Sequence, residues 1–419
     1  MSPVTVVIAG AGGRGFDYGD YIAAHPELGK VVGVAEPREP YRLRMAQKHG
    51  IPSANVFDDW RKLADRPRLA DSVLICTQDA MHADPACAFA AKGYHILLEK
   101  PMAPNAADCR RIVSAVQAAG VLFAVGHVLR YTRYTRVLKK LLAEGAVGDV
   151  VSVQHLENVG WWHQAHSFVR GFWRNTAESS FMLLSKSCHD LDWIRHVMGV
   201  PCRKLASFGS LKHFRRAEKP ACAGGATRCV ACDYEGDCPY SARKIYLRDL
   251  REDNPCWPSA TLVAHWSVAN VEKAVAEGPW GRCVYECDND VVDNQVVIMD
   301  FEGGRTACFT MTAFNAGGHR KSRIFGTRGE IYGDGRLLEH FDFLTRQRKT
   351  IDTEASEGDI TGGHGGGDSG LITAFLSAVG RGEPSLILSG SDETLESHLM
   401  VFAAEQARLE NRVVDMAEM

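Results

Sequence analysis

The chain has 419 residues, 24% of them charged, and a formal net charge of −3 at pH 7. This balance, without a long run of one sign, gives no indication of a nucleic-acid or polyanion-binding surface. No apolar run approaches the length of a membrane-spanning helix. The length exceeds that of one ordinary hydrophobic core, so two domains are expected.

The first residues form a strand pattern that leads into a glycine-rich turn. Residues 4–9 are mostly β-branched, as in a strand buried on both faces, and residues 10–15 read G-x-G-x-x-G. In this motif the first glycine permits a tight turn, the second lets backbone approach a pyrophosphate, and the third lets helix pack on strand. The following helix N-terminus offers N–H groups to phosphates. We therefore expect a bound dinucleotide, with contacts from Gly10, Gly12, Gly13, Arg14 and Gly15. Because no basic, apolar and cleavage regions precede the strand, we also expect a soluble, cytoplasmic protein.

The second strand, residues 31–35, ends in Glu36, which lies 21 residues after Gly15. A carboxylate at this distance is expected to bind the adenosine ribose. Its charge would repel the 2′-phosphate of NADP, which favours NAD. Arg38, two residues later, carries a positive charge that favours NADP instead.

Strands and helices continue to alternate. Further strands are expected at 72–76, 94–98 and 121–126, and helices at 41–49, 84–93 and 106–119. Asn105 and Gly120 have the residue types that begin and end a helix. The alternation predicts an α/β fold, a doubly wound parallel sheet over residues 1–127.

Glu99-Lys100-Pro101 follows the strand at 94–98. Proline ends the strand, so the tripeptide turns at the carboxyl edge of the sheet, where ligands bind. A lysine there can supply a proton or a positive charge to a reacting hydroxyl. The alternative is a surface turn with a solvated ion pair. Thr77, His82 and Glu99 belong to the same edge, and we expect them beside the cofactor.

Residues 128–419 have a different pattern. Strands are expected at 150–153, 295–301, 306–314 and 322–326, with a hairpin turn at 303–304, and helices at 137–144, 189–198 and 392–410, the last capped by Ser391. This pattern predicts an α+β domain with a large, mostly antiparallel sheet. Residues 212–260, rich in Cys, Pro and charge, are expected to be an insertion.

The order of these motifs, with a His-x-x-Asp helix in the second domain, resembles the glucose–fructose oxidoreductase / inositol dehydrogenase / MocA (Gfo/Idh/MocA) family. The resemblance covers the chain outside the insertion. It implies NAD(P) in the first domain, Lys100 beside the nicotinamide, and His189 paired with Lys100. Dehydrogenases of this family usually carry an aspartate four residues before that histidine, where this chain has Ser185 followed by Lys186.

Each of these three residues also has a plain alternative. Lys100 would be a solvated lysine, and His189 a core histidine bonded to backbone. Lys186 would either contribute to the reaction and bind substrate, or pair with Asp190 or Asp192.

Residues 161–175 alternate aromatic and basic side chains. Aromatic faces and multidentate donors hold sugar rings and anionic groups, so we expect a substrate wall. The alternative is ordinary core beside a charged face. His364 lies in a glycine-rich helix start, for which the alternative is a flexible loop. The expected substrate-binding residues are Tyr131, Trp162, His163, His166, Arg170, Trp173, Arg174 and His364.

Four cysteines of the insertion form C-x6-C-x2-C-x5-C: Cys222, Cys229, Cys232 and Cys238. The pattern is typical of a structural zinc site. The proline after Cys238 also fits an iron–sulfur loop, and free thiols are the third alternative. The remaining cysteines resemble buried apolar residues in a reducing compartment.

Three functions follow from these features. The first is NAD-dependent oxidation of a sugar or glycoside, anionic ones included, with the hydroxyl proton passing to His189 or Lys100. The second is a redox-neutral NAD-dependent glycosidase that oxidises a sugar carbon, eliminates the aglycone, adds water and re-reduces the product. The third is a non-catalytic NAD-binding sensor. We expect a homo-oligomer without nucleic-acid or membrane partners.

Overall fold

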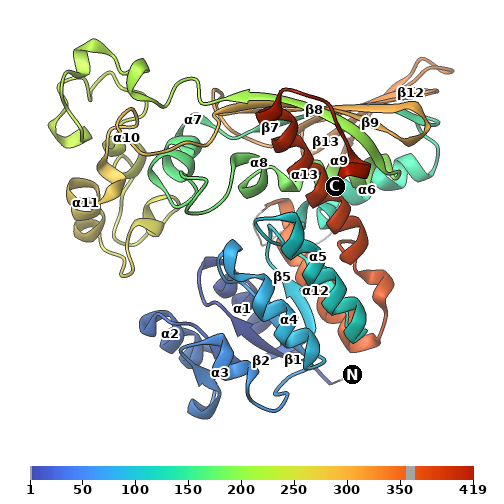
Figure 1. Cartoon of the computed structure of the whole chain (residues 1–419), viewed down its shortest axis with the longest axis horizontal. Coiled ribbons are helices and arrows are strands. Elements are labelled where there is room, and N and C mark those ends of the chain that lie inside the picture. Colours follow the sequence, from blue (N-terminus) through green and yellow to red (C-terminus); the bar gives the residue numbers. More distant parts are fainter. Residues whose placement is uncertain (1, 355–363) are drawn as a thin grey trace.

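A computed structural model of the chain describes residues 2–354 and 364–419, which are built around two β-sheets (Figure 1). Within these residues the first sheet has six parallel strands in the order β3-β2-β1-β4-β5-β6. The strands are β1 (Val4–Ala9), β2 (Gly29–Ala35), β3 (Val56–Phe57), β4 (Ser72–Ile75), β5 (His95–Leu98) and β6 (Phe123–Val125). The accompanying helices are α1 (Gly13–Ala24), α2 (Glu39–His49), α3 (Trp60–Ala64), α4 (Ala83–Ala91) and α5 (Ala106–Ala119). The predicted doubly wound Rossmann sheet is confirmed.

Local chemistry explains why these elements start and stop where they do. Asn105 accepts a hydrogen bond from the Asp108 N–H at 2.8 Å, and Gly120 ends α5 with a φ of 61°. In the turn after β1, Gly10 has a φ of 98°, and a Cβ there would lie 2.5 Å from the Cys76 carbonyl oxygen. A Cβ on Gly15 would lie 2.1 Å from the Gly10 carbonyl oxygen. Only glycine fits at these two positions.

The second sheet has nine strands in the order β14-β13-β12-β11-β7-β10-β9-β8-β15 within the described ranges. Its pairings are antiparallel except for that between β7 and β10, so the predicted α+β domain is confirmed. The strands are β7 (Val150–Asn158), β8 (Cys202–Ser210), β9 (Asn294–Phe301), β10 (Arg305–Thr312), β11 (Lys321–Gly326), β12 (Gly329–Gly333), β13 (Leu337–Asp342), β14 (Arg348–Asp352) and β15 (Val414–Asp415).

One face of the second sheet packs against helices. The helices are α6 (Arg133–Ala143), α8 (Met182–Ser185), α9 (Cys188–Met198) and α13 (Ser391–Glu410) (Figure 1). Along β9, Val297 and Met299 are buried in this core, whereas Val296 and Ile298 are exposed on the opposite face. The prediction that Ser391 caps α13 is wrong, because the helix includes this residue and begins after Gly390 without a side-chain capping bond.

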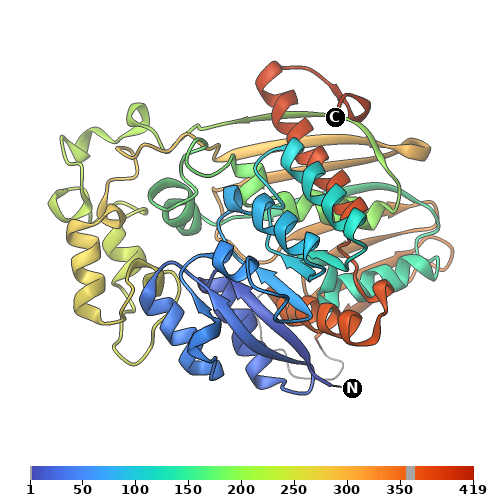
Figure 2. The ribbon, with the colours of Figure 1, turned by 60° about the horizontal axis from the view of Figure 1, so that its bottom comes forward.

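The C-terminal part of the chain returns to the first sheet. The helix α12 (Gly367–Arg381) lies beside the first sheet (Figure 2). Its residues Leu371, Ile372 and Phe375 share a core cluster with Ile8 and Val31. The division at residue 127 stays a prediction, since the first core also draws on residues far beyond it.

The cysteine-rich insertion lies between β8 and β9 and extends to residue 293, further than the sequence indicates. It contains α10 (Ala242–Tyr246) and α11 (Val268–Glu277), and it projects from one end of the second sheet beside α7 (Trp161–His163) (Figure 1). In the described part of the chain, no helix is long and apolar enough to cross a bilayer.

Candidate active site

A cavity of ≈ 700 Å³ connects the glycine-rich turn, the carboxyl edge of the first sheet, the start of α9 and the insertion. Its volume is that of a typical small-molecule site. Of the residues predicted from the sequence, those lining it are Gly12, Gly13, Arg14, Thr77, Glu99, Lys100, His163, His166, Trp173, Lys186 and His189.

The glycine-rich turn is shaped for a dinucleotide. A Cβ on Gly13 would meet no atom within 4 Å, so the backbone faces open space at the cavity. Glu36 accepts the Ala11 N–H at 2.8 Å and forms an ion pair with Arg38 at 2.7 Å. Burial opposes ionisation of Glu36, but hydrogen bonds from Arg38 hold the pKa of its carboxyl below the usual value. The glycine-rich turn therefore fits NAD. Glu36 is 2% exposed and does not line the cavity, so its contact with the ribose stays a prediction.

Two of the predicted cofactor residues, Glu99 and His82, hold neighbouring parts of the site in place. Glu99 accepts hydrogen bonds from Arg14 Nε at 2.9 Å and from the Tyr18 hydroxyl at 2.6 Å. His82 is fully buried and does not line the cavity. Its ring nitrogens lie 2.8 Å from the Pro101 carbonyl oxygen and 3.1 Å from that of Thr77. His82 thus joins two loops at the edge of the cavity, and its contact with the cofactor stays a prediction.

Lys100, just after β5 of the first sheet, and His189, on α9 beside the second sheet, both line the cavity. Lys100 Nζ donates to the Ser185 carbonyl oxygen at 2.9 Å. Ser185 is the residue that stands where the family resemblance predicts an aspartate. His189 lies in the first turn of α9, and its ring meets that of His127 edge-on at 5.7 Å between centroids. A substrate in the cavity can reach both groups.

Lys186 also lines the cavity, and its ion pair differs from the one considered from the sequence. Its Nζ lies 3.2 Å from Glu157 Oε1, not beside Asp190 or Asp192. Glu157 also pairs with Arg320 at 2.9 Å. The cation is therefore anchored at the cavity by a buried carboxylate.

Asp79 is a cavity residue that the sequence reasoning missed. Burial raises the pKa of its carboxyl, and His82 and Lys100 counteract only part of that rise. Its position two residues after Thr77, at the same sheet edge, was a usable signal. A carboxyl group of raised pKa close to Lys100 can hold or pass a proton.

His163 and His166 are neutral imidazoles. Burial, together with the charges of Lys186 and other neighbours, holds the pKa of His163 well below its usual value. Burial and then Arg170 lower the pKa of His166 to about 4. A neutral ring at the cavity can accept a hydrogen bond from a sugar hydroxyl.

Aromatic rings from the insertion form the far wall, and the sequence did not reveal them. The Trp257 ring meets that of His163 edge-on at 5.0 Å between centroids, and Trp280 stacks on His166 at 4.9 Å. Both tryptophans line the cavity. Aromatic faces of this kind pack against sugar rings.

Four other predicted substrate residues lie outside the cavity. Trp162 packs behind Trp257, and the Tyr131 hydroxyl lies 2.9 Å from Ser389 Oγ. Arg174 pairs with Asp288 at 2.9 Å, and Arg170 is buried beside the cysteines of the insertion. Each of these side chains contacts other parts of the protein and not the cavity, which the alternation of aromatic and basic residues in the sequence does not reveal. The side chain of His364 lies outside the described part of the structure.

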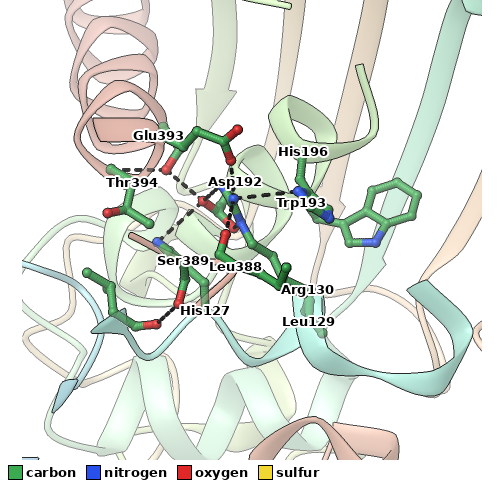
Figure 3. A network of polar contacts seen from close by, with 12 residues as sticks. His127, Leu129, Arg130, Asp192, Trp193, His196, Leu388, Ser389, Glu393 and Thr394 are labelled. Carbon is green, nitrogen blue, oxygen red and sulfur yellow. Dashed lines mark hydrogen bonds and ion pairs between the residues drawn. The ribbon is translucent and has the colours of Figure 1, made fainter. Parts of the chain in front are cut away.

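A buried ionic network fixes the end of α9 that carries His189 (Figure 3). Arg130 donates through Nε and Nη2 to both carboxylate oxygens of Asp192, each at 2.7 Å, and also contacts Glu393 of α13. Ser397 Oγ donates to Asp192 at 2.8 Å. Burial opposes the charge on Asp192, but Arg130 holds its pKa far below the usual range. Through Arg130, the network joins the segment that follows β6 to α9 and α13.

The predicted zinc ligands are not assembled. Among the described residues, no group of three or more His, Cys, Asp or Glu side chains is placed to hold a metal ion, and Cys222 is exposed.

Comparisons with known proteins fit this architecture. Family models described as "Oxidoreductase family, NAD-binding Rossmann fold" and "Oxidoreductase family, C-terminal alpha/beta domain" match residues 4–127 and 139–416. The 2,7-anhydro-N-acetylneuraminate hydratase of Escherichia coli is 31% identical over 147 residues, 35% of this chain and 38% of that protein. The levoglucosan dehydrogenase of Pseudarthrobacter phenanthrenivorans is 26% identical over 197 residues, 47% of this chain and 48% of that protein.

The first curated relatives are thus matched over only 38% to 54% of their own length. A solved structure of levoglucosan dehydrogenase with NADH and levoglucosan has a TM-score of 0.70 at 18% identity and covers 99% of both chains. That of aldose-aldose oxidoreductase from Caulobacter crescentus with glycerol has a TM-score of 0.68 at 17% identity, again over 99% of both chains. At these levels of identity, the two solved structures show that the chain shares their fold.

Proposed function

The chain belongs to the Gfo/Idh/MocA oxidoreductase family, and we propose that it oxidises a sugar or glycoside with NAD. The observation that carries the proposal is the single cavity that runs from the glycine-rich turn past Lys100 and His189 to an aromatic wall. NAD, when bound, supplies the hydride acceptor. The names of the two sugar-related relatives support a carbohydrate substrate.

The residues of the chain handle the proton. Loss of hydride from a sugar carbon makes its hydroxyl acidic, and the proton passes to Lys100 or His189, which both line the cavity. Lys186 supplies a fixed positive charge that suits a hydroxyl losing its proton or an anionic sugar. Trp257 and Trp280 hold the ring of the sugar.

We propose NAD in preference to NADP. Glu36 carries a negative charge where a 2′-phosphate would lie, and its pKa is held low by Arg38. The variant Glu36→Gln should weaken NAD binding roughly tenfold, the cost of a hydrogen bond to a charged group, and should narrow the preference over NADP. Titrations with both cofactors test this, and tighter NADP binding by the parent protein would show that Arg38 dominates.

Redox-neutral glycoside cleavage is the second candidate. It requires a further base, because a proton must leave the carbon next to the transient ketone. His163 is a neutral imidazole in the same cavity, and Lys100 meets a backbone carbonyl instead of the aspartate usual in the family's dehydrogenases. Both observations favour chemistry beyond simple dehydrogenation.

One experiment separates these functions. The protein with NAD is incubated with a panel of free sugars and aryl glycosides, and both NADH and released aglycone are followed. Accumulating NADH identifies a dehydrogenase, and aglycone without NADH identifies the redox-neutral enzyme. Tight NAD binding with neither product across the panel contradicts both and favours a sensor.

We also propose a homo-oligomer that pairs through the open face of the second sheet. Phe208, Val296 and Ile298 are 65%, 41% and 51% exposed on neighbouring strands β8 and β9. Contiguous apolar side chains on one face are typical of an interface. Light scattering should find a multimer, and Ile298→Lys should dissociate it. A monomeric parent protein would contradict the proposal. The cytoplasmic location remains a prediction.

A further inference from the structure

The insertion contains a second, much smaller cavity that is bordered by four cysteines. Cys229, Cys232, Cys238 and Cys283 line a space of ≈ 20 Å³, whereas Cys222 does not border it. A space of this size holds a single water-sized particle. It suits one ion and is too small for a multinuclear cluster.

Cys283 reaches this cavity through backbone pairing. The Cys283 N–H donates to the Thr227 carbonyl oxygen at 2.8 Å, and Arg228 and Arg282 form an isolated antiparallel bridge. The two segments therefore lie side by side, and Cys283 arrives beside Cys229 from the far end of the insertion.

The sulfur atoms at this cavity act as hydrogen-bond acceptors. The Ala242 N–H donates to Cys229 Sγ at 3.3 Å, and the N–H groups of Tyr240 and Tyr285 donate to Cys238 and Cys283. The nearest acceptor for the Cys229 S–H, the Arg282 carbonyl oxygen, is 3.9 Å away. Burial raises the pKa of the Cys238 and Cys283 thiols, and these N–H donors offset part of that rise.

A buried cation completes the environment. Arg170 is 2% exposed, and in the described part of the structure it has no ion pair with a carboxylate and no acceptor for its Nη1. Its Nη2 lies 3.6 Å from Cys229 Sγ and donates to the Tyr240 carbonyl oxygen at 2.7 Å. An uncompensated buried charge costs several kcal/mol, so an anionic group is expected beside it.

We propose that Cys229, Cys232, Cys238 and Cys283 bind one structural zinc ion. Binding releases four thiol protons and leaves four thiolates around Zn²⁺, a net charge of −2 that Arg170 reduces to −1. The four cysteine side chains are not positioned as metal ligands in this structure. Binding of zinc therefore requires them to rotate so that their sulfur atoms point into the cavity. Cys283 replaces Cys222 in the ligand set that the sequence indicated.

The zinc would support the substrate wall. Cys229 shares a small core with Tyr246 and Trp280, and the Tyr246 hydroxyl lies 3.1 Å from His166 Nδ1. Ordering the cysteines therefore orders two rings of the larger cavity. The metal would make the insertion rigid, because its short helices and few apolar residues do not form a stable core of their own.

The test compares Cys283→Ser with the matched control Cys222→Ser, both in the full-length protein. Elemental analysis of protein purified without chelator should find about one zinc per chain in the parent and in Cys222→Ser, and less than a tenth of that in Cys283→Ser. Zinc retained in Cys283→Ser, zinc lost in Cys222→Ser, or iron or no metal in freshly reduced parent protein would overturn the proposal.

A second measurement needs no variant and covers the case in which Cys283→Ser does not fold. Thiol alkylation of the native parent, read by mass spectrometry, should label Cys222 with or without chelator. It should label the other four cysteines together, only after a chelator removes the zinc. Labelling of Cys283 without chelator would contradict the assignment.

Discussion

The two walls of the large cavity are built in different ways. On the first-sheet wall, the groups that face the cavity follow directly from local sequence: Gly12 and Gly13 in the turn after β1, and Lys100 just after β5. On the insertion wall, Trp257, Trp280 and His166 meet only because distant loops fold together. The first wall presents backbone and charge, and the second presents aromatic rings.

This difference assigns the walls different tasks. Backbone N–H groups and a fixed lysine suit a dinucleotide and proton transfer, which are common to a whole family. Rings carried by an insertion suit the recognition of one substrate. We expect changes in the first wall to affect catalysis and changes in the second to affect sugar binding.

The largest effect is expected from Lys100→Met. Loss of a positioned proton-transfer group typically reduces turnover by roughly 10²–10⁴-fold. Affinity for NAD should be nearly unchanged, because the pyrophosphate is held by the glycine-rich turn. Turnover and NAD titration check this, and near-normal turnover would place the chemistry elsewhere.

The next effect concerns the network that holds α9. Asp192→Asn leaves Arg130 buried without its main partner, and breaking such a pair costs about 3–5 kcal/mol of folding free energy. The control is Asp300→Asn, whose ion pair with Arg203 lies at the surface and is worth about 0–1 kcal/mol. Urea unfolding measures both, and equal losses would show that the network is not important for stability.

Acid should destabilise the insertion wall through His166. Its pKa is near 4 in the folded protein and near 6.5 when unfolded, so the unfolded chain binds more protons between these values and stability falls as pH falls. The loss from pH 7 to pH 5 should be roughly 2 kcal/mol for this group. His166→Gln should flatten the pH dependence of unfolding by that amount, and an unchanged slope would contradict the assignment.

The smallest effect is expected from Trp257→Leu. Loss of ring contacts costs about 0.5–1.5 kcal/mol, so the KM for the sugar should rise by up to tenfold while kcat changes little. Steady-state kinetics test this. A fall in kcat with unchanged KM would move Trp257 to the reacting centre.

Sequence predicted most of the first wall, but of the second only His163, His166 and Trp173 and not the tryptophans of the insertion. A parallel strand that ends just before Glu99-Lys100-Pro101 places Lys100 at the carboxyl edge of the sheet. The position of Lys100 therefore followed from the sequence. Arg170 resembled an anion-binding residue, but its neighbours are backbone carbonyls and a thiol from segments about 60 to 110 residues away. Cys283 was missed because only backbone pairing of residues 227–228 with 282–283 reveals its proximity to the other cysteines.

Calorimetric titration of Trp257→Leu with NAD measures whether the first-sheet wall binds the cofactor independently of the insertion. If the first-sheet wall alone holds the cofactor, the Kd for NAD should equal that of the parent protein even where the KM for the sugar has risen. A Kd for NAD that rises by the same factor as the KM would contradict the separation and place the insertion against the cofactor.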